Sequence, residues 1–349
     1  MTASSRVFEN SARILGVRFL DDVDELRSLT AEWNYLYERT SDTTPFQRAE
    51  WLLPWIEIFC PRHWFAITIR DGSRLIGLAL LVIYPRDGKR ILAFAGGGVS
   101  DYLGLLCEPG REAEVVGNMI ESVAPEPDWD VLELTDVAAR SALLKLHVFE
   151  GRIHEHDWVS ILPLPEAKEQ LLGIFSKRQR ANLRNAASRM RRSGGGRIES
   201  TTSETLAECL DDLFRLHTTR WAQSGQPGVL ADESTRVFHE RCAPALLAKG
   251  ILKIHRLKLG AQTIAVLYSL WERGTVFCYM QGFDPAYAKL SPGTQLVFAV
   301  MEEAQRQGIR KFDFLRGQEA YKEHWRARAQ ATFCITTHKS SLKQNVIPA

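Results

Sequence analysis

The two halves of this 349-residue chain repeat one order of predicted elements, and this repeat limits the fold more than any other feature. In each half, two helices precede a meander of three strands, and another helix and strand follow. Gly72 and Gly260, in the first hairpin of each half, lie 188 residues apart, and Leu134 and Leu315, in the last strand, lie 181 apart. The similar offsets indicate a duplicated domain rather than chance similarity between strand patterns.

We therefore expect an α/β protein of two tandem domains, residues 1–160 and 161–349. Each domain should be a mixed, mostly antiparallel sheet flanked by helices. A chain of this length exceeds the usual size of a single core, which agrees with two units.

Composition excludes several classes of protein. The net charge of +2 does not suit a chain that binds polyanions over its whole surface. The longest apolar stretch, residues 76–84, is about half of what a membrane span needs. The start of the chain lacks the apolar run of a signal peptide, and six scattered cysteines in mostly apolar surroundings are typical of buried, reduced thiols. We expect a cytoplasmic protein without a transmembrane segment.

Motifs of several enzyme classes are absent from the sequence: the G-x-S-x-G elbow, the phosphate-binding G-x-x-x-x-G-K-[ST] loop and the zinc-binding H-E-x-x-H helix. His154 and His156 share one face of a predicted strand but have no third ligand nearby. We interpret this segment as an exposed edge strand and predict no metal site.

Residues 282–308 are the first of three segments that suit a functional site. A strand ends beyond Gly282, and Ser291, Gly293 and Thr294 lead into an amphipathic helix. Small residues at a helix start leave backbone N–H groups available to a phosphate. The same residues also suit a plain helix cap, so both interpretations stay open.

The second segment is a basic helix, Lys177–Arg192, followed by three glycines. Residues 177–197 contain eight Lys or Arg and no acid, and Lys177, Arg180, Arg184 and Arg191 form one stripe. A charge run is often only a solvated face, but solvated faces commonly mix signs. The alternative is an anionic partner: a nucleotide phosphate, a nucleic acid or an anionic lipid surface.

The third segment follows the last predicted strand, residues 310–315. It contains Asp313, and the ten residues 316–325 that follow include Arg316, Glu319, Tyr321, Lys322, His324 and Trp325. The matching part of the first half lacks these side chains, so we expect the active site in the second half. On another predicted helix, His217, Arg220 and Trp221 share one face, where core packing is the competing explanation for Trp221.

These three segments together resemble the GNAT superfamily of N-acyltransferases. They are most similar to bacterial acetyltransferases linked to cellulose and exopolysaccharide synthesis, which are relatives of the FemAB-like aminoacyl transferases. The carboxy-terminal resemblance covers about residues 171–333. In the first half, residues 44–55 and 96–104 are similar to the same group, whose members are twin GNAT domains.

The resemblance implies an acyl donor, usually acyl-CoA, and an amine acceptor that attacks its carbonyl carbon. It implies Asp313 as the base, Tyr321 as the acid for the leaving group and Lys322 as an anchor for a phosphate or the oxyanion. It places the donor at Gln281, Gly282, Ser291, Gly293 and Thr294, although the usual Gln- or Arg-led, glycine-rich loop is missing. The acceptor site would include Arg316, Glu319, Trp325, His217, Arg220, Trp221, Asp101 and Tyr102.

Three functions remain open from the sequence. The first is acyl-CoA-dependent N-acylation of a sugar, lipid or cell-envelope precursor, with O-acylation as a variant and with peripheral contact to a membrane. The second is aminoacyl-tRNA-dependent transfer, which the basic helix suits, although the chain has no long helical arm. The third is a non-catalytic GNAT-fold partner of an exopolysaccharide-synthesis complex.

Overall fold

The computed structural model describes residues 15–60, 62–146, 152–166, 168–223, 225–317 and 320–341. One large mixed sheet runs through this part of the chain, in the strand order β1-β2-β3-β4-β6-β13-β7-β12-β11-β10-β9-β8. In the first half, antiparallel strands form a meander and β6 pairs parallel to β4. The strands are β1 (Gly16–Leu20), β2 (Trp64–Asp71), β3 (Arg74–Arg86), β4 (Lys89–Phe94) and β6 (Val131–Ala138), and the short β5 (Leu106–Cys107) pairs with β3.

The second half repeats this pattern, which confirms the predicted fold class. Its strands are β8 (Gly196–Ser200), β9 (Leu252–Leu259), β10 (Gln262–Glu272), β11 (Thr275–Phe283) and β12 (Lys311–Arg316), of which β12 is parallel to β11. The helices are α1 (Val23–Ser28), α2 (Thr30–Arg39), α3 (Ala49–Phe59), α4 (Glu112–Val123), α5 (Lys168–Gly173), α6 (Lys177–Arg192), α7 (Leu206–Gln223), α8 (Glu233–Ala248), α9 (Pro292–Arg306) and α10 (Ala320–His324). Four short 3-10 turns, η1 (Pro45–Gln47), η2 (Ala142–Lys145), η3 (Val229–Ala231) and η4 (Pro285–Leu290), lie in the connections.

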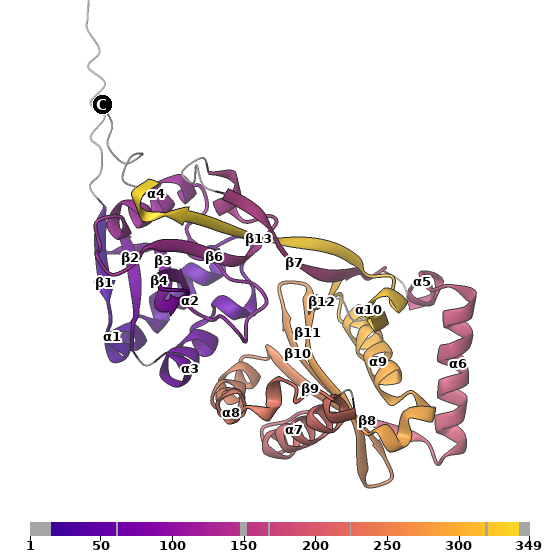
Figure 1. The fold of residues 1–349 in the computed structure, drawn as a ribbon. Helices are drawn as coiled ribbons and strands as arrows, with labels where there is room; N and C mark the ends of the chain where they lie inside the picture. The colour runs from indigo at the N-terminus through magenta and orange to yellow at the C-terminus, as the bar shows by residue number, and fades with distance from the viewer. Residues whose placement is uncertain are drawn as a thin grey trace, which may run out of the picture.

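Two long strands join the halves at the centre of the sheet (Figure 1). β7 (Arg152–Pro163) follows the first half and pairs with β12 of the second, whereas β13 (Arg328–His338) follows β12 and pairs with β6 of the first. β7 and β13 also pair with each other. The exposed edge strand predicted around His154 is confirmed locally, because residues 153–156 are exposed and pair with β13 on one side, while β12 pairs only with residues 159–163. The boundary predicted after residue 160 falls within β7 and stays a prediction.

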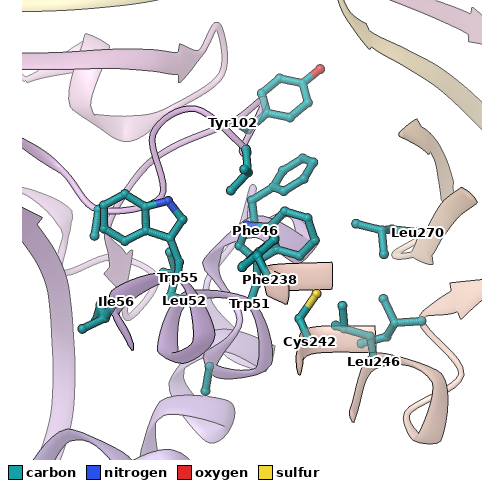
Figure 2. Close-up of a cluster of buried hydrophobic side chains, with 14 of the residues drawn as sticks. Phe46, Trp51, Leu52, Trp55, Ile56, Tyr102, Phe238, Cys242, Leu246 and Leu270 are labelled. Carbon is teal, nitrogen blue, oxygen red and sulfur yellow. The ribbon is translucent and has the colours of Figure 1, made fainter. Parts of the chain in front are cut away.

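The halves also share a hydrophobic core, in which α3 of the first half packs on α8 of the second (Figure 2). The rings of Trp51 and Phe238 meet edge to face with centroids 4.8 Å apart, and both side chains are fully buried. Five of the six cysteines are buried, as their apolar surroundings predicted. The two halves consequently form one packed unit.

A bulge in β11 decides which side chains face which layer. Tyr268 pairs with Met280 while Ser269 pairs with Cys278, so Tyr279 is the extra residue. Since side chains alternate along a strand, one extra residue exchanges the two faces beyond it. Gly282 then lies directly against α7, where an added Cβ would be 2.5 Å from the His217 nitrogen. Only glycine permits this approach.

We expect Gly282→Ala to lower the free energy of unfolding by about 1–3 kcal/mol. The added methyl group would clash with the α7 backbone, and neither α7 nor β11 can move away without strain. Urea denaturation measures this. Gly117→Ala is the control, since Gly117 lies inside α4 with no atom near an added Cβ, and alanine there should stabilise by about 0.5–1 kcal/mol. Equal stability of Gly282→Ala and the wild type would contradict the close contact.

His239 on α8 is a titratable group inside the shared core. Its side chain is fully buried among the rings of Trp51, Phe238, Tyr268 and Tyr279. Neither ring nitrogen has a hydrogen-bond partner within the described residues. Burial, with a smaller effect of His217, lowers the pKa of His239 to about 3. The imidazole is therefore neutral in the folded protein at neutral pH.

Acidification should destabilise the protein through His239. Below about pH 6.5, His239 binds a proton in the unfolded chain but stays neutral in the folded protein. The free energy of unfolding therefore falls by about 1.4 kcal/mol per pH unit until the folded pKa is reached. Urea denaturation between pH 6 and 4 should show this slope lost in His239→Leu and kept in His154→Leu, because His154 is exposed. His217, with a pKa lowered to about 4, adds to the wild-type slope, and Asp313, with a pKa raised to about 6, opposes it. Identical slopes in the two variants would show that His239 titrates normally.

Candidate active site

The parallel strands β11 and β12 part after three residue pairs. Thr275, Val276 and Phe277 pair with Lys311, Phe312 and Asp313, and β12 then bulges where it meets β7. Beside the diverging part of β11 lies a cavity of about 460 Å³. Its walls come from β11, α6, α7, the start of α9 and the end of α10. They consist of Phe175, Gln179, Asn182, Leu183, Asn185, Ala186, Arg189, Arg220, Gln281, Phe283, Ser291, Gly293, Thr294, Val297, His324 and Trp325.

Four of the five predicted donor-binding residues line this cavity: Gln281, Ser291, Gly293 and Thr294. The fifth, Gly282, faces α7 instead, for the reason that the β11 bulge gives. At the start of α9, Ser291 is left-handed (φ 52°) and its side chain caps no helix N–H, while Pro292 occupies the first helical position. The first turn of α9 therefore borders the cavity with the positive end of the helix dipole.

Two arginines add positive charge to the cavity wall. Arg189 of α6 donates from Nε to the Lys289 carbonyl oxygen (2.7 Å) and from Nη2 to Ser291 Oγ (3.4 Å). Arg220 of α7 donates to the Gln281 carbonyl oxygen (3.4 Å) and lies near the Phe283 ring. Arg220 was predicted for the acceptor site, and Arg189 was missed. Arg189 lies on the same helical face as Gln179, Asn182 and Ala186, because these residues are spaced three or four apart. This shared face was the sequence signal that could have identified Arg189.

The predicted basic stripe lies elsewhere on the same helix. α6 begins and ends as predicted, because Ser176 and Gln179 form a capping box at its start. Lys177, Arg184 and Arg191 are exposed, and Arg180 is half-buried with its guanidinium on the Phe175 carbonyl oxygen (2.8 Å). None of these four belongs to the cavity wall. Their binding of an anionic partner stays a prediction.

The structure brings Asp101 and Tyr102 of the first half to Asp313 and Arg316 of the second. The Tyr102 hydroxyl donates to Asp313 Oδ2 (2.6 Å), and Arg316 Nε donates to Asp101 Oδ1 (2.9 Å). Burial raises the pKa of Asp313 to about 6, although the Tyr102 hydrogen bond opposes this. Burial, followed by the Asp313 charge, raises the pKa of Tyr102 well above its usual value, so Tyr102 keeps its proton. Asp313 does not line the cavity, and its role as base stays a prediction.

Lys322 and the residues around it lie on α10 and directly after it. Lys322 is buried, and its Nζ donates to the carbonyl oxygens of Leu315 and Gly317 (both 3.2 Å) and of Arg316. His324 and Trp325 line the cavity. Trp325 was predicted for the acceptor site, whereas His324 was noted in this segment without a role. Glu319 lies outside the described residues, and the Tyr321 side chain is likewise not described.

Of the three residues predicted on one face of α7, His217, Arg220 and Trp221, only Arg220 lines the cavity. His217 is buried behind it against the Trp221 ring, with centroids 6.0 Å apart. Burial, with a smaller effect of Arg220, lowers the pKa of His217 to about 4. Both rings would contact a Cβ at Gly228, which indicates close packing around them. Their predicted contact with the acceptor stays a prediction.

The equivalent gap of the first half is filled by its own chain. β4 and β6 part after Leu92 and Leu132, but Leu103 returns to pair with Val137, and β5 then pairs with β3. A second cavity, of about 420 Å³, lies beside this filled gap. Only the second half thus leaves its two parallel strands open to a ligand within the part of the chain that the structure describes.

No cluster of three or more His, Cys, Asp or Glu side chains within the described residues is suited to hold a metal ion. Among the described helices, none combines the length and the apolar character that a membrane crossing requires.

Comparison with known proteins agrees with this geometry. Residues 177–323 match the family model described as "Acetyltransferase (GNAT) domain". No curated protein sequence is significantly similar to the chain.

Several solved structures have a similar fold. FemX is 12% identical over 90% of this chain and 97% of its own, with a TM-score of 0.65. A conserved protein of unknown function from Bacteroides thetaiotaomicron is 14% identical over 93% and 99%, with a TM-score of 0.61. The carboxy-terminal domain of a putative lysylphosphatidylglycerol synthetase from Agrobacterium fabrum is 10% identical over 92% and 95%, with a TM-score of 0.58. At these identities the likeness concerns the fold alone.

The matched segment runs from the first residue of α6 to α10, and it supplies nearly the whole cavity wall. The sheet with its diverging parallel strands, the helix that starts at the cavity and the family match lead to one conclusion. Residues 177–323, in the carboxy-terminal half of the chain, therefore form a domain that matches the GNAT acetyltransferase family.

Proposed function

We propose that this protein transfers an acyl group from a coenzyme A thioester to a primary amine in the cavity beside β11. The observation that carries the proposal is the open divergence of β11 and β12, with a cavity bounded by the start of α9. Beyond Phe277 the backbone of β11 has no pairing with β12, so its polar groups on that side remain for a ligand.

The cavity wall combines cationic, polar and apolar groups that suit such a donor. The first turn of α9 and Arg189 provide a setting for the diphosphate. Phe175, Phe283 and Trp325 provide apolar surface for the arm and the acyl chain. The amides of Gln179, Asn182 and Asn185 can bond polar groups of the donor.

The reaction requires three events at the carbonyl carbon. The amine nitrogen attacks it and a base removes the proton of the developing ammonium, while N–H donors stabilise the oxyanion. The C–S bond then breaks, and the thiolate takes up a proton. We propose His324 as a second candidate base beside Asp313, because His324 lies in the cavity wall. Tyr321 and Lys322 keep their predicted roles as proposals.

The acceptor we propose is an amino group of a sugar, lipid or cell-envelope precursor in the cytoplasm, with contact to a membrane surface where the precursor is a lipid. The link to exopolysaccharide synthesis belongs to the same proposal. Its support is the sequence resemblance.

Arg189→Gln should weaken the binding of acetyl-CoA about 10- to 100-fold, because a hydrogen bond to a charged group contributes about 1.5–3 kcal/mol. Isothermal titration measures the Kd, and a series of acetyl-, medium- and long-chain CoA esters identifies the donor. Arg184→Gln is the matched control: it removes the same charge from the exposed face of the same helix and should leave the Kd unchanged.

Two other outcomes of the binding measurements would favour the alternative functions. Aminoacyl-tRNA as the donor predicts RNA binding that weakens in the triple variant Arg180→Gln, Arg184→Gln, Arg191→Gln and that falls steeply with salt. This alternative is favoured by one observation, the eight cations without an acid in residues 177–197. Binding of neither CoA esters nor RNA would favour a non-catalytic partner of an envelope-synthesis complex.

The base can be assigned by two variants. We expect His324→Gln to lower kcat about 100-fold or more with an unchanged donor Kd, since general base catalysis contributes about 10²–10⁴ in rate. Asp313→Asn should lower kcat about tenfold, because asparagine keeps only one of the two hydrogen bonds that the carboxylate accepts, from Tyr102 and from the Leu315 N–H. Steady-state kinetics with a primary amine acceptor measure both, and the reverse order would assign the base to Asp313.

A further inference from the structure

We propose that residues 96–103 of the first half position the active site of the second, with Tyr102 and Asp101 as positioning residues. Through the end of β12, this loop fixes α10 and the part of the cavity wall that α10 carries. The inference extends the proposed function, and its activity readout rests on it.

The loop is first held firmly by its own half. Trp55 Nε1 donates to the Gly97 carbonyl oxygen and Trp51 Nε1 to Ser100 Oγ, both at 3.0 Å. Gln47 Nε2 donates to the Tyr102 carbonyl oxygen at 2.7 Å. Ser100 is fully buried and Tyr102 is 7% exposed. A loop anchored by buried indoles and an amide has little freedom to move.

Three residues of the loop, Val99, Asp101 and Tyr102, form hydrogen bonds with the second half. Tyr102 Oη donates to Asp313, and Arg316 donates to Asp101 (2.9 Å). Tyr279 Oη, at the β11 bulge, donates to the Val99 carbonyl oxygen (2.6 Å). Arg316 also donates to Asp136 (3.3 Å), at the end of β6. The contacts fall on both strands at the place where they diverge.

The part of β12 that the loop holds has a strained backbone. Leu315 adopts a left-handed conformation (φ 61°) at the bulge, which a leucine rarely does. Its N–H donates to Asp313 Oδ1 (2.8 Å), while Oδ2 of the same carboxylate accepts from Tyr102. Such a conformation persists only where the surroundings over-determine it. Tyr102 and Asp101 supply that constraint from the other half.

α10 is tied to the same turn and carries the constraint to the cavity. Lys322 contacts the carbonyl oxygens of three consecutive residues, 315–317. Trp325, directly after α10, stacks near Phe314 and meets the Phe175 ring edge to face (centroids 5.5 Å apart). His324 lies between Lys322 and this anchored ring in sequence and borders the cavity. A loosened β12 end would therefore misplace His324 and Trp325.

Tyr102→Phe tests the proposal, and Tyr37→Phe is its matched control. Tyr37 is also buried, and its hydroxyl also donates across the halves to a carboxylate, Glu272 (2.6 Å), away from α10. We expect Tyr102→Phe to lower kcat about 10- to 100-fold, because small misplacements at a reacting centre have effects of this size. The acetyl-CoA Kd should stay unchanged, since Arg189 and α9 do not depend on this loop. Tyr37→Phe should keep the wild-type kcat.

A second measurement does not depend on activity. In hydrogen exchange followed by mass spectrometry, Tyr102→Phe should speed exchange in the end of β12 and in α10 by about tenfold or more, whereas Tyr37→Phe should not. Equal losses of kcat in the two variants, or unchanged exchange in α10 of Tyr102→Phe, would overturn the proposal. If the wild type binds no CoA ester, the proposed function fails, and the exchange experiment alone decides the positioning role.

Discussion

The exchange of β7 and β13 between the halves is the constraint on which the rest of the structure depends. Each half closes its own meander, but the strand that follows it pairs with the other half. Separation of the halves would expose the backbone groups of four central strands and the aromatic core around Trp51 and Phe238. The relative placement of the halves is therefore fixed by main-chain hydrogen bonds rather than by side chains alone.

This fixed placement lets one copy of a duplicated fold serve the other. Both halves have parallel strands that part, but Leu103 closes the gap in the first. The residues just before Leu103 then meet Asp313 and Arg316 at the open gap of the second. Because the central strands hold the halves in register, a loop that is 211 residues away along the chain can hold a single carboxylate. The asymmetry between the copies explains why the cavity beside open parallel strands lies in the second half.

Much of the fold and part of the site could be predicted from the sequence. α6 was predicted to the residue, because its capping box and the glycines after it are local signals. α9 was predicted to begin at Thr294 and begins two residues earlier, at Pro292. Arg189 was missed and His324 was given no role, since an arginine among eight cations and a histidine in a polar tail carry no local sign of the cavity they face. The pairing of β7 with β13 was not predicted, because alternation in a strand does not reveal its neighbours.

The sequence by itself determined the duplicated α/β pattern, the position of the main helices and of the meander strands, and the match of residues 177–323 to the GNAT family, because hydrophobic period, caps and turns act over a few residues. It did not reveal β1, β8, α10 or β13. Only the tertiary structure decided that β7 and β13 exchange halves, that Gly282 faces α7 and that Tyr102 meets Asp313. These outcomes depend on strand register and on a one-residue bulge, and a shift of one residue turns a side chain from one face of a sheet to the other.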